Sequence, residues 1–282
     1  MAFITTLVLG AGYHAYCQNN ESWLRIDNIF REAISSSVTP SGLIYVLDKG
    51  TDEVIKLSPE GKIVSRVGGF GWAETAFDLP ADIYSPNDIR TYVADYGNHR
   101  IVYLDGNLNF LSFLQLHEGD DLTNRFGYPK SAATDRFGSL YIVDGENTRI
   151  VKMGALNTID LTFGGVDGGK GRLSAPGRVR VTPDDIVYVR DGDNIMIYDI
   201  YGNFINKVPF PDNYKFRTYT VYQSSLFILD SLGVRGITAN CDTSMAMEAA
   251  TTAIDVAVTS DKIYFLTRTG IIIQPFDTAW IR

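Results

Sequence analysis

Five aspartates recur along the chain at nearly regular distances, each at the end of the pattern aromatic-x-x-Asp. They are Asp48, Asp95, Asp144, Asp191 and Asp230. A ring of such carboxylates could coordinate a metal ion such as calcium. At the end of a strand, however, a short carboxylate also accepts hydrogen bonds from the backbone N–H groups of the turn that follows. Turn residues follow each of these aspartates, so we favour the structural role and predict no metal site.

The histidines and cysteines form no pattern typical of a metal or catalytic site. They are His14, His99, His117, Cys17 and Cys241. Their spacing contains neither the CxxC nor the HExxH motif of zinc sites. His99 lies beside Arg100 without the nearby carboxylate that a general base needs. The segment Gly164–Gly171 lacks the Ser or Thr and the following helix of a phosphate-binding loop.

Three 13-residue segments that end in proline are the longest candidate loops. They are Gly68–Pro80, His117–Pro129 and Gly164–Pro176. Their tenth residues, Phe77, Phe126 and Leu173, are apolar, and we expect them to be buried between repeats. The remaining residues follow no packing period, and loops on a rigid scaffold often carry binding residues. On these segments and in one neighbouring turn, the predicted binding residues are Trp72, Arg125, Lys170, Arg172, Phe70 and His99.

The elements that must position these residues are short β-strands in a repeating unit. A sixth copy of the pattern, Tyr264–Thr267, has lost its aspartate, and the copies are 47, 49, 47, 39 and 37 residues apart. Residues 33–282 thus divide into six units of about 42 residues, the length of a four-stranded propeller blade. Val, Ile, Tyr and Phe fill the expected strands, and Pro, Gly, Asn and Asp mark the turns. We predict an all-β, six-bladed β-propeller of four-stranded antiparallel blades.

The ring is expected to close with strands from both ends of the chain. The sixth unit supplies only three candidate strands before the chain ends: Ile254–Val258, Lys262–Leu266 and Gly270–Pro275. A strand-like run, Trp23–Phe30, precedes the first unit. We predict that this N-terminal run forms the outer strand of the last blade, which leaves few unpaired sheet edges.

Two units carry a more specific resemblance. Tyr92–Ile101, YVADYGNHRI, resembles the signature that gives NHL repeats their name, and Tyr141–Ile150, YIVDGENTRI, is a close second copy. The first and fourth units match more loosely, and the last two keep only the strand pattern. The resemblance covers about residues 33–282 and implies a six-bladed propeller. This family includes protein-binding scaffolds, RNA-binding proteins and a few lyases and hydrolases, so the resemblance implies little about activity.

The function expected from these observations is binding without catalysis. Lyases that resemble this chain use several histidines from different blades, which three histidines cannot reproduce. We therefore expect a non-catalytic scaffold that presents the loops of one face to a protein, peptide or glycan partner, without a cofactor. The opposite face carries only tight turns, which are expected to be too short to build a pocket. The alternative is a calcium-dependent hydrolase or lyase with its site at the central channel.

The net charge of the chain limits its possible partners, and its N-terminal segment bears on its cellular location. A net charge of −8 and a pI near 4.9 disfavour nucleic-acid binding, because acidic surfaces repel phosphate groups. The apolar segment Ala2–Tyr16 is shorter than the roughly 20 residues that span a bilayer. It is similar to the apolar region of a secretory signal cleaved after Cys17, although no Lys or Arg precedes it; the alternative is an N-terminal β-strand.

We predict a signal peptide over residues 1–17 and a single propeller domain over residues 18–282. The protein is then secreted or periplasmic, and it is cytoplasmic if the N-terminal segment is retained. No membrane span is expected.

Overall fold

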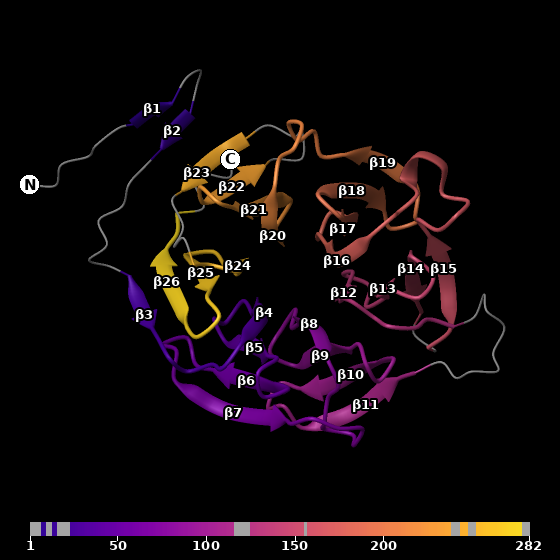
Figure 1. Cartoon of the computed structure of the whole chain (residues 1–282), viewed down its shortest axis with the longest axis horizontal. Helices are drawn as coiled ribbons and strands as arrows, with labels where there is room; N and C mark the ends of the chain where they lie inside the picture. Colours follow the sequence, from indigo (N-terminus) through magenta and orange to yellow (C-terminus); the bar gives the residue numbers. More distant parts are fainter. Residues whose placement is uncertain are drawn as a thin grey trace, which may run out of the picture.

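The structure is a computed structural model that describes residues 7–9, 13–15, 23–115, 125–154, 157–237, 243–247 and 252–277. Six β-sheets are arranged in a ring around a central axis (Figure 1). In the described ranges, the regular structure consists of β-strands and one 3-10 turn, η3 (Gly169–Gly171). The predicted all-β, six-bladed propeller is confirmed.

Each blade contains four antiparallel strands, numbered below from the innermost strand outward. Blade 1 consists of β4 (Ala33–Val38), β5 (Ile44–Asp48), β6 (Glu53–Leu57) and β7 (Ile63–Gly68). Blade 2 consists of β8 (Pro80–Tyr84), β9 (Arg90–Asp95), β10 (Arg100–Asp105) and β11 (Phe110–Leu114). Blade 3 consists of β12 (Ala132–Thr134), β13 (Leu140–Asp144), β14 (Arg149–Met153) and β15 (Ile159–Phe163).

The second half of the ring repeats this arrangement. Blade 4 consists of β16 (Pro176–Val181), β17 (Ile186–Asp191), β18 (Asn194–Asp199) and β19 (Phe204–Lys207). Blade 5 consists of β20 (Phe216–Tyr222), β21 (Ser225–Asp230), β22 (Val234–Ile237) and β23 (Thr243–Met247). Blade 6 consists of β24 (Asp255–Val258), β25 (Lys262–Leu266), β26 (Ile271–Pro275) and β3 (Leu24–Ile26).

The last blade is completed by a strand from the start of the chain. β3 pairs antiparallel with β26, with Ile26 opposite Ile271 and Leu24 opposite Ile273. Strands from distant parts of the sequence therefore meet in one sheet, and the predicted closure by the N-terminal run is confirmed. The pairing also covers the outer edge of β26, which would otherwise be open to pairing with another chain.

Two further short strands extend blade 5. β1 (Leu7–Leu9) and β2 (Tyr13–Ala15) form a hairpin, and β2 runs parallel to β23, with Ala15 opposite Ala246. Both strands lie within the predicted signal peptide. Their pairing is no test of cleavage, so the signal peptide and the domain boundary after residue 17 stay predictions.

The blades pack against one another through apolar side chains. Leu47 of blade 1 and Ile83 of blade 2 lie in one cluster with Phe77, which belongs to the connection between the two blades. Phe126 and Leu173 occupy the corresponding places in the next two blade interfaces. All three predicted apolar residues of the connections are buried, as expected. Full burial of such a side chain contributes about 1.5–3 kcal/mol, so the connections stabilise the blade interfaces.

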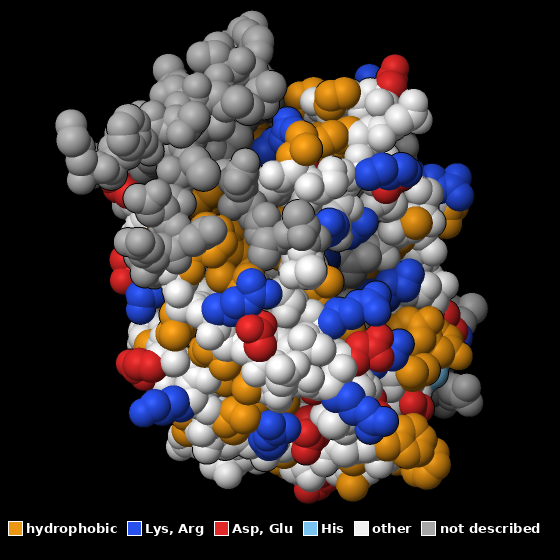
Figure 2. Space-filling model, turned by 60° about the vertical axis from the view of Figure 1, so that its left-hand side comes forward, with side chains coloured by type: hydrophobic (Ala, Val, Ile, Leu, Met, Phe, Trp, Pro, Cys, Tyr) orange, Lys and Arg blue, Asp and Glu red, His pale blue; other side chains and the backbone are white. Residues whose placement is uncertain are grey.

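The two faces of the ring carry different turns. Turns between the second and third strands lie with the connections between blades, on what we call the connection face. Turns between the first and second strands lie on the opposite face of the ring, which we call the pocket face because of the cavity described below. On the side of the molecule shown in Figure 2, acidic and basic side chains are interspersed. Among the described residues, no helix is long and apolar enough to cross a membrane.

Candidate functional site

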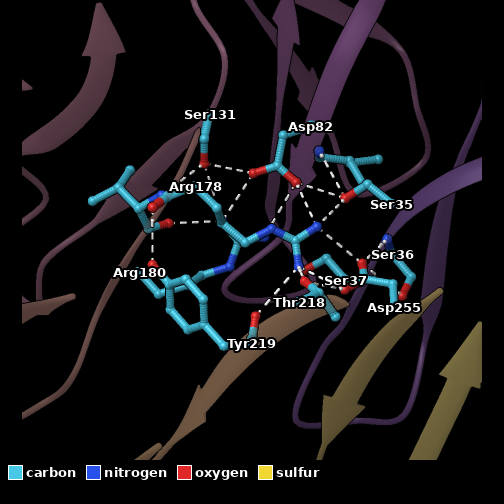
Figure 3. A network of polar contacts seen from close by, with 12 residues as sticks. Ser35, Ser36, Ser37, Asp82, Ser131, Arg178, Arg180, Thr218, Tyr219 and Asp255 are labelled. Carbon is cyan, nitrogen blue, oxygen red and sulfur yellow. Dashed lines mark hydrogen bonds and ion pairs between the residues drawn. The ribbon is translucent and has the colours of Figure 1, made fainter. Parts of the chain in front are cut away.

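One side chain from each blade, on or next to the innermost strand, points toward the central axis. In chain order these six residues, the axial ring, are Ser35, Asp82, Ser131, Arg178, Thr218 and Asp255. Blades 2, 4 and 6 supply the charged side chains, and blades 1, 3 and 5 supply hydroxyl groups. Hydrogen bonds and ion pairs connect them across the ring, as Figure 3 shows.

Arg178 lies at the centre of the axial ring. Its Nη1 donates to Asp255 Oδ1 at 2.6 Å and to Thr218 Oγ1 at 2.8 Å. Its Nη2 donates to Asp255 Oδ2 at 3.0 Å. The same nitrogen donates to Ser35 Oγ at 3.1 Å and to Asp82 Oδ1 at 3.2 Å. The guanidinium group therefore bridges carboxylates from two blades and contacts Asp255 with both terminal nitrogen atoms, a geometry that makes strong ion pairs.

Asp82 is held by two cations and two hydroxyl groups. Arg180, two residues beyond Arg178 on β16, donates from Nη1 to Asp82 Oδ2 at 2.9 Å. The hydroxyls of Ser35 and Ser131 each donate to the carboxylate at 2.6 Å. Burial raises the pKa of Asp82, but the guanidinium groups of Arg180 and Arg178 outweigh it and hold that pKa well below its usual range. Asp82 is therefore ionised at neutral pH and is a poor general base.

The charges at the axis cancel. Burial lowers the pKa of Arg178, but Asp255 and Asp82 more than reverse this, so its pKa lies above its ordinary value. Two carboxylates thus face two guanidinium groups, those of Arg178 and Arg180, with all four side chains almost fully buried. Buried ions need such pairing, because removal from water costs several kcal/mol for each charge.

A cavity of about 480 Å³ opens beside the axial ring on the pocket face. Arg180 and Ser36 line it near the ring, Tyr84 and Ser85 line its side, and prolines of the turns between first and second strands, such as Pro40, line its rim. Of the described residues that line this central pocket, only Arg180 is charged. The expectation that this face is too short to build a pocket is wrong, because inward-facing side chains of the innermost strands build the walls, not the turns alone.

Tyr84 is a neutral hydrogen-bonding group in the wall of the central pocket. Burial raises the pKa of its hydroxyl, although the nearby Arg180 lowers it, and the result lies above the ordinary value. The Arg180 guanidinium lies over the Tyr84 ring at 5.4 Å from the ring centre. The tyrosine is therefore protonated at neutral pH and holds the arginine by a cation–π contact.

The six predicted binding residues lie outside the central pocket. Phe70 and Trp72 are 68% and 75% exposed on the connection between blades 1 and 2, and their rings meet edge to face at 6.0 Å. Arg125 forms an ion pair with Glu146 at 2.9 Å. His99 packs against Tyr128 with ring centres 3.9 Å apart.

The two remaining predicted residues lie at η3 and at its end. Lys170 belongs to η3, and Arg172 follows it and lines a separate cavity with Asn147 and Thr148. The structure thus brings Phe70 and Trp72 together but distributes the six residues over three connections and, for His99, the turn between β9 and β10 of the connection face. Their role in binding stays a prediction.

The repeating aspartates have the structural role predicted for them. Asp48 accepts from the backbone N–H groups of Arg31 and Glu32 at 2.7 Å. Asp95 accepts from the N–H of Asp78 at 2.8 Å and from Arg100 Nε at 2.8 Å. The other three accept backbone N–H groups in the same way. These carboxylates hold the connections and turns of the connection face, so they do not form a central metal site.

A divalent cation does not fit the axial ring either. The two carboxylates that could bind calcium, Asp82 and Asp255, already face the guanidinium group of Arg178. In the described part of the chain, no group of three or more His, Cys, Asp or Glu side chains is arranged to hold a metal ion. The calcium expected under the alternative interpretation would therefore find, among the described residues of the axis, carboxylates that are already paired with Arg178.

The axial ring was missed by the sequence analysis, although a weak signal exists. Four of its members, Ser35, Asp82, Ser131 and Arg178, lie 13 residues before the aspartate of their own aromatic-x-x-Asp pattern. The other two lie 12 residues before the corresponding position. Because the residue type changes at this position from unit to unit, the position does not appear as a motif.

Comparison with known proteins supports the fold. No family model and no curated protein matches the sequence. Among solved structures, the chain is similar to virginiamycin B lyase from Staphylococcus aureus, with a TM-score of 0.60, 11% identity and coverage of 90% of this chain and 99% of that one. It is also similar to a gluconolactonase from Xanthomonas campestris, with a TM-score of 0.67, 11% identity and coverage of 90% and 89%.

These similarities correct the prediction of a non-catalytic scaffold, because the structural neighbours are enzymes. The physical reason is that the ring has a central pocket, which the turn lengths did not reveal. At 11% identity the likeness shows the fold, and membership of the NHL repeat family is not confirmed. The chain is a six-bladed β-propeller whose structural neighbours are of the virginiamycin B lyase and gluconolactonase type.

Proposed function

We propose that this protein is a propeller enzyme, a hydrolase or lyase, that acts on a small uncharged ester or lactone in the central pocket. The observation that carries the proposal is the pocket itself, with Arg180 as the one charged residue among its described lining. Its volume of about 480 Å³ falls within the range of roughly 300–1,000 Å³ of small-molecule sites. The two similar proteins, a lyase and a gluconolactonase, support a catalytic role.

The lining favours an uncharged substrate. The residues that line the cavity include Ser36, Ser85 and Thr259, which carry hydroxyl groups, and apolar residues such as Val181. A substrate with several charges would find no matching ions in this lining except Arg180, whose charge is already balanced by Asp82. Hydroxyl groups can donate to and accept from the oxygen atoms of an uncharged ester or sugar lactone.

Arg180 is the residue that we expect to stabilise the transition state. When water attacks the carbonyl carbon of an ester or lactone, negative charge develops on the carbonyl oxygen before the bond to the alcohol oxygen breaks, and a fixed cation beside the carbonyl oxygen lowers the barrier. Asp82 and the carbonyl of Val179, at 2.9 and 2.8 Å from Arg180 Nη1, hold the guanidinium in place before substrate arrives. The protonated hydroxyl of Tyr84 is a second candidate donor. Asp82 itself does not act as a base, because its pKa is held low.

A histidine matters for the activity of the similar lyase. That protein has also been solved as a catalytically inactive histidine-to-alanine variant. The six residues of the axial ring in the present chain include no histidine. The proposed reaction therefore relies on charge stabilisation by arginine.

The proposal is tested with purified protein and a panel of uncharged lactones and carboxylic esters. We expect turnover of at least one member, and a loss of about 100- to 1,000-fold in kcat for Arg180→Gln, the size found for removal of an oxyanion donor. The matched control is Arg136→Gln, because Arg136 lies on the pocket face in an exposed ion pair with Asp185, outside the central pocket. Absence of turnover, or full activity of a folded Arg180→Gln protein, would overturn the proposal.

Three predictions from the sequence carry over as separate proposals. We propose that residues 1–17 are removed during secretion, which N-terminal sequencing of the mature protein tests. We propose that the blades descend from NHL-type repeats, on the strength of the segments at Tyr92 and Tyr141. We also propose that the exposed Phe70 and Trp72 bind a protein, peptide or glycan partner on the connection face, so that Trp72→Ala weakens capture of that partner and leaves turnover in the central pocket unchanged.

A further inference from the structure

In the described part of the chain, the hydrogen-bond acceptors around the guanidinium group of Arg178 are all oxygen atoms. Its two terminal nitrogens lie between 2.6 and 3.3 Å from carboxylate oxygens of Asp82 and Asp255, hydroxyl oxygens of Ser35 and Thr218, and the carbonyl oxygen of Tyr219. Carboxylate, hydroxyl and carbonyl oxygens are also the ligands of hard divalent cations. The axis therefore has the donor types of a cation site, and a side chain of the protein supplies the cation.

We propose that the guanidinium group of Arg178 is the built-in central cation of this propeller, which takes the place of a bound metal ion and makes the ring independent of divalent cations. Arg178 in this role stabilises the axis of the ring. This role holds whether or not the proposed ester or lactone chemistry is correct.

The charges of the axis support this inference. Asp82 and Asp255 balance Arg178 and Arg180, so an added divalent cation would meet two guanidinium groups within the same buried site. Without Arg178, Asp82 would still be paired with Arg180. Asp255 would keep only the backbone N–H and hydroxyl of Ser36 and the hydroxyl of Thr218 among its described contacts. An unpaired buried carboxylate would result, and such a group attracts a cation.

The shape of the Arg178 guanidinium group matters as well as its charge. Arg178 is anchored on blade 4 and bonds with fixed, planar geometry to Asp255 on blade 6 and to Asp82 on blade 2. A guanidinium group presents its N–H donors in a rigid fork, whereas an ammonium group does not. The arginine therefore links three alternate blades through one rigid group, and lysine is not an equivalent replacement.

The first experiment measures the wild-type protein. We expect its melting temperature to stay the same after dialysis against EDTA and after addition of millimolar calcium or magnesium, and metal analysis to find far less than one ion per chain. A metal ion that copurifies at one per chain, or a calcium-dependent rise in melting temperature, would overturn the proposal.

The second experiment empties the site with Arg178→Ala. We expect the melting temperature to fall by several degrees and to be partly restored by millimolar guanidinium ion or calcium, because either can pair with the freed Asp255. The control is Arg136→Ala, whose ion pair is exposed, and for which guanidinium only weakens the fold as it does in proteins generally. A variant that melts at the wild-type temperature, or that responds to neither cation, would contradict the inference.

A third variant keeps the experiment decisive if Arg178→Ala does not fold. Arg178→Lys retains the positive charge but loses the fork, so we expect a lowered melting temperature without a response to calcium. A calcium-dependent stabilisation of the lysine variant would show that the charge of residue 178 does not exclude metal, and would overturn the proposal.

Discussion

Two buried aspartate–arginine contacts, one at the connection face and one at the axis, use the same chemical groups in different ways. Near the connection face, Asp95 accepts from Arg100 Nε at 2.8 Å, and the rest of that guanidinium donates to backbone carbonyls of Trp72, Ala73 and Ala76. At the axis, Asp82 faces two guanidinium groups at once. Asp95 thus contacts one guanidinium group, which also donates to backbone carbonyls. Asp82 contacts two guanidinium groups.

The difference appears in the direction of the pKa shifts. Burial raises the pKa of Asp95 above its usual value, although Asn98, the backbone and Arg100 lower it in part. Burial acts in the same direction on Asp82, but Arg180 and Arg178 together reverse the result. The number of cations around a buried carboxylate therefore decides whether its ionised form is favoured or disfavoured in the folded protein.

The two contacts also differ in how regularly their residues recur around the ring. The aspartate of the connection face recurs in five blades because each blade needs the same turn and connection held. The axial position holds two carboxylates, one arginine and three hydroxyls across six blades. Repetition thus marks the scaffold, and variation at the axis marks the site that distinguishes this propeller from others with the same fold.

The largest effect is expected for Asp82→Ala, which leaves Arg180 without its carboxylate partner. Breaking a buried ion pair by removal of one side chain costs about 3–5 kcal/mol. Urea unfolding of the variant measures the loss. The matched control is Asp185→Ala, which breaks the exposed pair with Arg136. Equal losses for the two variants would show that burial at the axis adds nothing.

A smaller effect is expected for Asp95→Ala. The variant loses the acceptor for the backbone N–H of Asp78 and for Arg100 Nε, but the terminal nitrogens of Arg100 keep their three carbonyl acceptors. We expect a loss of about 1–3 kcal/mol in the free energy of unfolding, typical of an unsatisfied buried donor. Enzymatic activity per folded molecule should be unchanged. A loss as large as that of Asp82→Ala would remove the distinction between the two contacts.

The two aspartates should also give pH effects of opposite sign. Because the pKa of Asp82 is lowered on folding, its stabilising contribution is present above about pH 4 and is lost as the pH falls further. Because the pKa of Asp95 is raised, its contribution is complete below about pH 4 and decreases as the pH rises through its folded pKa. Each unit of pKa difference corresponds to about 1.4 kcal/mol.

Unfolding free energies of wild type, Asp82→Asn and Asp95→Asn, measured from about pH 3 to about pH 6, test these signs. The difference between wild type and Asp82→Asn should shrink toward acid, and the difference between wild type and Asp95→Asn should shrink toward neutral pH. Parallel curves for the two variants would contradict the pKa directions.

The smallest effect is expected for Arg125→Ala. Its ion pair with Glu146 is partly exposed on the connection face, and such pairs contribute about 0–1 kcal/mol. Thermal unfolding should shift little and the ester or lactone turnover should not change. A large loss of stability would place Arg125 among the structural contacts, beside Asp95.

Much of the fold was determined by the sequence alone. The six blades, their four-stranded pattern, the closing strand β3 and the burial of Phe77, Phe126 and Leu173 were all predicted correctly. These features follow from local turn chemistry, from alternation of apolar side chains and from a repeat length of one blade. The role of Asp48 and Asp95 was predictable for the same reason, since an aspartate at a strand end acts on backbone groups close by.

Only the tertiary structure decided the axial ring and the central pocket. Arg178 is 77 residues from Asp255 and 96 from Asp82 in the sequence, so no local pattern pairs them. The alternation of side chains along an innermost strand shows which of them face the axis. It does not show which inward-facing side chains of the other blades they contact. They meet when the ring closes and brings six inner strands around one axis. Closure also creates the pocket, whose walls come from blades that share no sequence motif at that position.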